Sequence, residues 1–160
     1  MTLNDYAQTI CFWAGDNELG EGGQPVKWSK LPEILRLVES RIGTANAGQR
    51  FAIAGVVLAL ESQRPELFPS IRATHRHLYR EIGLVMECNG VQEWADFHVA
   101  QWLITNDPLC IDKVLDQAAN GGDAGHYASA ALAALSQKWK PFEVAIDKAR
   151  EARRAAMVIQ

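Results

Sequence analysis

The chain has 160 residues, of which 48% are hydrophobic and 22% are charged, which is typical of a globular protein and excludes a disordered one. Its net charge of -3 is too small to indicate a nucleic-acid binder or an acid-coated protein. The three cysteines are widely spaced and form no CxxC pair, which argues against a disulfide framework and favours a reducing compartment. No basic-then-apolar leader is visible at the N-terminus, so we expect one cytoplasmic domain over residues 1–160.

Charge is distributed unevenly along the chain. Residues 41–80 contain six arginines against two glutamates, a net charge of +4, whereas residues 81–120 contain seven acids against one lysine, a net charge of -6. Two interpretations stay open. The blocks either face each other across the fold, or they leave a basic and an acidic surface, each able to steer a partner.

The first predicted helix covers residues 3–13, where apolar residues recur at helical spacing. Residues 14–28 contain four glycines and Pro25, which predict a surface loop. This loop lacks the Lys-Ser/Thr pair of a phosphate-binding loop and the alternating acids of a calcium loop. Trp28 stands at its end, and because tryptophan is enriched at binding hot spots, Trp28 is a candidate partner-binding residue.

The longest run without a polar side chain is Phe51–Leu60, which precedes Pro65. At ten residues it is too short to span a bilayer, which requires about 20. Because it is apolar on every side, we predict a buried central helix over about residues 49–64, ended by the proline. A shorter helix over residues 30–42, with Ser29 as its N-cap, should precede it.

The helix predicted over residues 69–82 carries an apolar stripe that includes His75. Beside it, Arg72, Arg76 and Arg80 follow one another at a spacing of four residues. The planar guanidinium group suits both phosphates and acidic protein surfaces. We therefore predict a row of partner-binding arginines on one continuous helix, which Gly83 should close.

The second half of the chain is also predicted to be helical. A nearly all-apolar helix over residues 91–105 should pack against the central one. Asn106 or Asp107 should cap the next helix, with Pro108 at its first position. Helices over residues 124–139 and 142–159 complete the chain. We predict an all-α fold of seven or eight short helices, arranged as an irregular bundle or as stacked helical hairpins around the central helix.

Metal and catalytic motifs are weak. His75 and His77 lack the i, i+4 spacing of helical zinc ligands, so we assign no metal and no cofactor. Cys88, beside an Asn-Gly turn, should be the most exposed thiol, but a cysteine with a distant histidine occurs in most proteins of this size and is not specific for catalysis. Acids such as Asp96 are interpreted as solvated helix-surface residues. A pocket containing His98 or His126 near a carboxylate would favour an enzyme, and we assign no catalytic residue.

The leading hypothesis is a helical protein that binds another protein, as an adaptor, inhibitor or immunity-type factor. Its predicted contacts are Arg72, Arg76, Arg80 and Trp28. One alternative is nucleic-acid association through the same arginines, and a second is a helical hydrolase or another enzyme. No membrane partner is expected. Apolar faces on the last two predicted helices leave a homodimer open.

Overall fold

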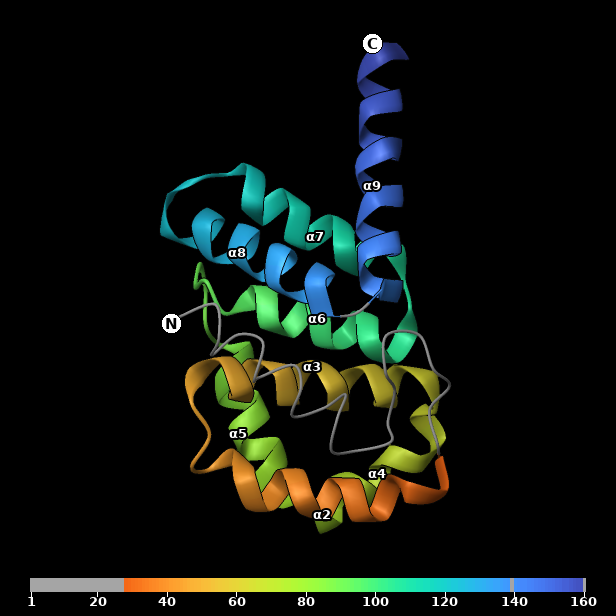
Figure 1. Cartoon of the computed structure of the whole chain (residues 1–160). Helices are drawn as coiled ribbons and strands as arrows, with labels where there is room; N and C mark the ends of the chain where they lie inside the picture. The colour runs from red at the N-terminus through yellow and green to blue at the C-terminus, as the bar shows by residue number, and fades with distance from the viewer. Residues whose placement is uncertain (1–27, 139, 160) are drawn as a thin grey trace.

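The computed structural model describes residues 28–138 and 140–159 (Figure 1). Within these ranges the chain forms eight α-helices and no β-strand, which confirms the predicted all-α fold. The predicted helix over residues 3–13 and the glycine-rich loop before Trp28 lie outside the described residues. None of the described helices combines the length and the hydropathy needed to cross a lipid bilayer.

The elements follow one another in the order η1 (Trp28–Lys30), α2 (Leu31–Ile42), α3 (Ala47–Gln63), η2 (Pro65–Leu67), α4 (Phe68–Thr74), α5 (Arg76–Met86), α6 (Trp94–Thr105), α7 (Pro108–Ala119), α8 (Gly122–Lys138) and α9 (Lys140–Ile159). In Figure 1, α2, α4 and α5 form the lower layer, and α3 and α6 lie above them. Helices α7 and α8 cover the other side of α6, and α9 projects away from the body.

Helix α3 is the buried central helix that the apolar run predicts. Asn46 begins it with a capping box, because its side chain accepts the backbone N–H of Gln49 and the Gln49 side chain accepts the N–H of Asn46. Pro65 follows two residues after its last residue. Every residue of Phe51–Val57 is buried, so this helix has no solvent-facing side over its middle turns.

Helix α6 packs directly on α3, as predicted. Gly55 permits this close approach: a Cβ added there would lie only 2.5 Å from the carbonyl oxygen of Phe97 and 3.1 Å from the Cβ of Ala100. Backbone therefore meets backbone where the two helices cross, and the smallest residue is required at that point. Trp94, at the start of α6, adds an edge-to-face contact to Phe51, with ring centroids 5.1 Å apart.

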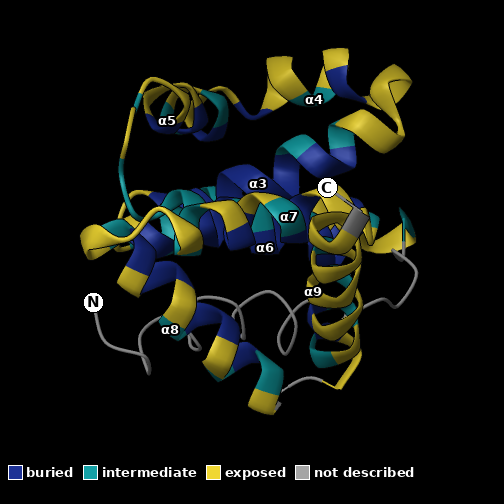
Figure 2. Ribbon diagram, turned by 90° about the horizontal axis from the view of Figure 1, so that it is seen from above, coloured by how far each residue is buried: buried dark blue, intermediate teal, exposed yellow. Residues whose placement is uncertain are grey.

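Helix α6 belongs to two hydrophobic clusters, which explains why it is apolar almost all round. Phe97, Ala100 and Ile104 pack into a first cluster with α2, α3, α4 and α5. Ala95, Val99, Trp102 and Leu103 pack into a second cluster with α7, α8 and α9. Figure 2 shows α3 and α6 in the middle of the molecule, with their residues largely buried. The described core thus has two parts, and α6 lies between them and contributes residues to both.

The single helix predicted over residues 69–82 is wrong, because the chain breaks at His75. This residue leaves the helical conformation (φ -110°, ψ 55°) and separates α4 from α5. Glu39 of α2 stabilises the break: one carboxylate oxygen accepts a hydrogen bond from Nδ1 of His75 at 3.0 Å, and the other accepts the N–H of Leu78 at 3.1 Å. A carboxylate from another helix thus caps the N-terminus of α5.

Two predicted helix ends are also wrong. Gly83 does not close its helix; α5 continues through it to Met86, since Gly83 is exposed and nothing opposes the helical path there. Ser29 does not cap α2, because Trp28–Lys30 forms a 3₁₀ turn that leads directly into the helix. At α7 the prediction is correct: the Asp107 side chain accepts the N–H of Leu109 at 3.0 Å, and Pro108 takes the first position.

Candidate functional site

The break at His75 divides the predicted row of arginines between two helices. Arg72 lies on α4, where its Nε and Nη2 each donate to one carboxylate oxygen of Glu61 at 2.7 Å. Its guanidinium also lies over the Tyr79 ring, 4.5 Å from the ring centroid. A bidentate ion pair and a cation–π contact hold this exposed side chain against Glu61 and Tyr79. Arg72 is therefore the arginine of the row least available to a partner.

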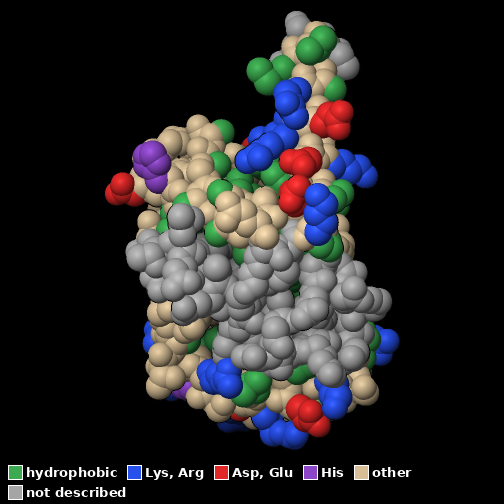
Figure 3. Space-filling view, viewed as in Figure 1, with side chains coloured by type: hydrophobic (Ala, Val, Ile, Leu, Met, Phe, Trp, Pro, Cys, Tyr) green, Lys and Arg blue, Asp and Glu red, His purple; other side chains and the backbone are tan. Residues whose placement is uncertain are grey.

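Arg76 and Arg80 lie on the outer side of α5, away from the buried Leu78 and Ile82. Both are exposed, and neither forms an ion pair with another residue of the described ranges. Leu84, one turn further on, is 55% exposed. These three residues, at a spacing of four, form what we call the α5 ridge. In Figure 3, Lys and Arg side chains gather at the lower end of the molecule, around α2, whereas both signs are mixed along α9.

Trp28 is half-buried and packs against the first hydrophobic cluster. The guanidinium of Arg64 covers its ring, 4.6 Å from the ring centroid. This cation–π contact ties the turn before α2 to the C-cap residue of α3. The ring has a structural role in this position, and its use as a partner contact stays a prediction.

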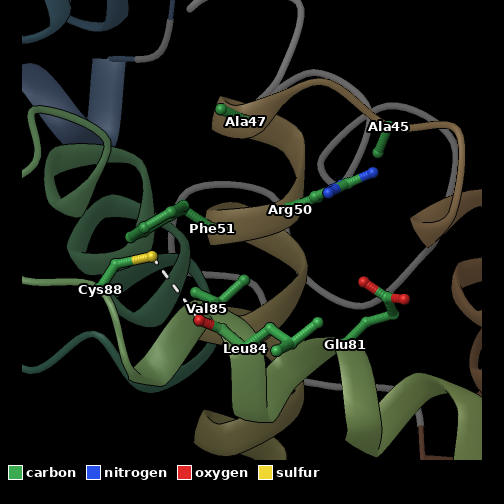
Figure 4. Close-up of a pocket in the computed structure, with 8 residues that line it drawn as sticks. All are labelled: Ala45, Ala47, Arg50, Phe51, Glu81, Leu84, Val85 and Cys88. Atoms are coloured by element: carbon green, nitrogen blue, oxygen red, sulfur yellow. Dashed lines mark hydrogen bonds between the residues drawn. The ribbon is translucent and has the colours of Figure 1, made fainter.

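A groove of about 440 Å³ lies beside the α5 ridge, between α5, the start of α3 and the α2–α3 connection (Figure 4). We call it the α3–α5 groove. Its lining residues are Ala45, Ala47, Arg50, Phe51, Glu81, Leu84, Val85 and Cys88. Leu84 belongs to both the ridge and the groove, so the two surfaces are continuous.

The α3–α5 groove has a polar end and an apolar end. At the polar end, Arg50 and Glu81 extend from opposite walls, and no ion pair joins these two side chains (Figure 4). Arg50 donates one hydrogen bond, from Nη2 to the carbonyl oxygen of Gly43 at 3.2 Å, while its buried Nε has no acceptor. At the apolar end, Phe51 and Val85 form the floor.

Cys88 lies at the apolar end of the groove and is half-buried. Its thiol donates a weak hydrogen bond to the carbonyl oxygen of Leu84, with a sulfur–oxygen distance of 3.6 Å. Cys110, by comparison, is buried in the second cluster, and burial raises the pKa of its thiol. Of these two thiols, Cys88 is the more accessible, as the sequence predicts.

His98 and His126, the two histidines whose pocket would favour an enzyme, lie on different helices in different surroundings. His98 stacks on Trp94, with ring centroids 6.1 Å apart, and its Nδ1 is buried without a partner. Burial lowers the pKa of His98 to about 4, and the nearby Lys113 adds to this effect. His126 is exposed on α8, and neither residue lines the α3–α5 groove. Across the part of the chain that the structure describes, no three His, Cys, Asp or Glu side chains converge as metal ligands.

Asp96 is a buried carboxyl that the sequence analysis wrongly placed on the helix surface. It is 0% exposed; the hydroxyl of Tyr127 donates to its Oδ2 at 2.5 Å, and its Oδ1 has no hydrogen-bond partner. Burial raises the pKa of this carboxyl well above its usual range, although the tyrosine hydrogen bond acts in the opposite direction. The pair joins α6 to α8 inside the second cluster and reaches neither groove nor surface.

Comparison with known proteins gave no match to a family model, to a curated protein or to a solved structure. The fold and its surfaces therefore define the class only as an all-α protein with a basic ridge beside a groove of mixed polarity.

Proposed function

We propose that this protein acts by binding another protein through the α5 ridge. The observation that carries the proposal is the state of Arg76 and Arg80, which are exposed and form no ion pair with any described side chain. Arginine is enriched at interface hot spots, and Leu84 adds an exposed apolar side chain beside the two arginines. Of the residues that the sequence proposes, these two arginines are the best placed.

The charge of the ridge favours a partner with an acidic surface. Two guanidinium groups at a spacing of four residues can each donate two hydrogen bonds to a carboxylate in a bidentate geometry. Arg72 contributes less, because its fork is already occupied by Glu61. An adaptor, an inhibitor and an immunity-type factor would all use such a surface, and the proposal extends to binding rather than to one of these roles.

The test is a tagged pull-down from native lysate, followed by mass spectrometry, with and without nuclease. The double variant Arg76→Glu/Arg80→Glu should lose a partner that the unchanged protein retains. Arg150→Glu/Arg154→Glu is the matched control, because these arginines are also exposed at a spacing of four, on α9. The control should keep the partner. Retention of the partner by the ridge variant would refute the assignment of the ridge.

Nuclease treatment distinguishes nucleic-acid association, the alternative function, from direct binding to a protein. A ridge of two arginines can neutralise about two phosphates, so nucleic-acid affinity should fall with salt with a log–log slope of only about -2. Partners that disappear after nuclease treatment, together with such a slope on a DNA or RNA oligonucleotide, would support this alternative. A protein partner that survives nuclease supports the leading proposal.

A further inference from the structure

We infer that the α3–α5 groove binds a peptide segment, with one apolar side chain against Phe51 and Val85 and a main-chain peptide group hydrogen-bonded between Arg50 and Glu81. This inference rests on the proposed function, because it states which part of a protein partner the face beside the ridge recognises.

The polar end presents a donor and an acceptor that do not satisfy each other. A guanidinium has five N–H donors, and the described contacts of Arg50 use one of them, towards Gly43. Glu81, on the opposite wall, forms no hydrogen bond or ion pair with another described residue. Arg50 and Glu81 are both half-buried, so a ligand that hydrogen-bonds to both side chains can replace the water around them.

The pairing of opposite charges selects the chemistry of this ligand. A free carboxylate or phosphate would satisfy Arg50 but would be repelled by Glu81, and an amine would be repelled by Arg50. A peptide group is neutral and has both functions: its carbonyl oxygen accepts from the guanidinium, while its N–H donates to the carboxylate. A neutral amide is therefore the group that fits between these two side chains.

The apolar end has room for a side chain next to that peptide group. A groove of about 440 Å³ falls within the range of about 300–1,000 Å³ that is usual for ligand sites. Its floor, Phe51 and Val85, is 5% exposed at each residue, while Leu84 at the rim is 55% exposed. An apolar side chain lying on this floor would cover the rim leucine as well, which gives the segment its second point of contact.

The α5 ridge determines which charge the bound peptide should carry next to its apolar residue. Leu84 lines the groove and follows Arg80 by one turn of α5, so a segment that leaves the groove over Leu84 meets Arg80 and then Arg76. The expected ligand is thus a peptide with an apolar residue flanked on one side by acidic residues. Charge complementarity with the ridge favours this over a basic or uncharged segment.

The test begins with a random-peptide library selected on the full chain, whose enriched peptides are resynthesised with a fluorescent label. Affinities are then measured by fluorescence polarisation. Ala47→Phe should fill the groove and weaken binding by about tenfold or more, the equivalent of about 1.4 kcal/mol. Ala119→Phe is the matched control, since both alanines are exposed on helices, and it should bind normally. Circular dichroism checks that every variant is folded.

The peptide-group contact has its own test, a double-mutant cycle with N-methylated peptides. Methylation of the amide that donates to Glu81 should weaken binding to the unchanged protein by about tenfold, and the same methylation should have no effect on Glu81→Ala. Methylation scanned along the peptide identifies this position. If no single methylation couples to Glu81, the assignment of the peptide group is wrong.

The outcomes separate the groove from the ridge. Binding that is weakened by Arg76→Ala/Arg80→Ala and unaffected by Ala47→Phe would overturn the groove inference and leave the proposed function intact. Binding that is weakened by Ala47→Phe and unaffected by the double arginine variant would support the groove and refute the ridge. A library that yields no peptide sensitive to Ala47→Phe overturns the inference.

Discussion

Adding a single methyl group at Gly55 should force α3 and α6 apart. An alanine Cβ there would lie 2.5 Å from the carbonyl oxygen of Phe97, whereas ordinary contact begins at 3.4 Å, so the helices must separate locally by the difference, about 0.9 Å. The Cβ of Ala100, at 3.1 Å, is also too close. A backbone oxygen and a methyl group cannot rotate away, and the strain therefore falls on the packing of the two helices.

Two opposing terms determine the size of the effect. Replacing glycine by alanine within a helix stabilises the folded state by up to about 1 kcal/mol. Overpacking a core costs about 1–3 kcal/mol. Because the opposing atoms are rigid, we expect the upper end of this cost and a net loss of about 2 kcal/mol, which lowers the melting temperature by about 4–8 °C in a chain of this length.

Gly83→Ala is the control for the propensity term. Gly83 lies within α5, is exposed, and an added Cβ would meet nothing within 4 Å. This substitution should raise the free energy of unfolding by about 0.4–1 kcal/mol. The free energies of unfolding of the two alanine variants should therefore differ by about 3 kcal/mol, as measured by urea unfolding followed by circular dichroism. A Gly55→Ala protein as stable as the unchanged one would refute the argument from the helix crossing.

Two further predictions concern the side chains of Asp96, which is buried, and Glu39, which is half-buried. The folded state binds the Asp96 proton more tightly than the unfolded chain, so the stability that this group contributes at low pH is lost as the pH rises through its raised pKa. The free energy of unfolding of Asp96→Asn, measured by urea titration, should therefore rise relative to that of the unchanged protein as the pH increases above about 4. A difference between the two proteins that does not depend on pH would contradict this. Glu39→Ala should cost about 1–3 kcal/mol and accelerate amide hydrogen exchange at Leu78, because the N–H loses its acceptor. Glu39→Gln should cost less, and equal losses for the two variants would refute the capping role.

The sequence predicts the helices whose signals are local. The apolar run Phe51–Leu60 has only one stable environment in a protein of this size, and α3 occupies it. Asp107 and Pro108 fix the start of α7 by the same kind of short-range chemistry. These features depend on neighbours within a few residues, which the sequence contains directly.

The features that the sequence analysis missed depend on residues far apart in the chain. His75 breaks its helix through a contact with Glu39, 36 residues earlier, and Arg72 is held by Glu61, 11 residues earlier. Asp96 resembles a surface acid in sequence, but in the fold it is fully buried and accepts a hydrogen bond from Tyr127 of α8. The α3–α5 groove is likewise a product of tertiary packing, since its walls come from two helices separated by α4.

The position of α6 between two hydrophobic clusters has a consequence for how the protein unfolds. If α7, α8 and α9 detached as a unit, Val99, Trp102 and Leu103 would be left facing water on a helix still fixed to α3. Burying large apolar side chains contributes about 1.5–3 kcal/mol each, so such a half-open state carries a high free energy. The two halves should therefore unfold in one cooperative transition, with the slowest amide exchange of both halves converging on the same opening energy.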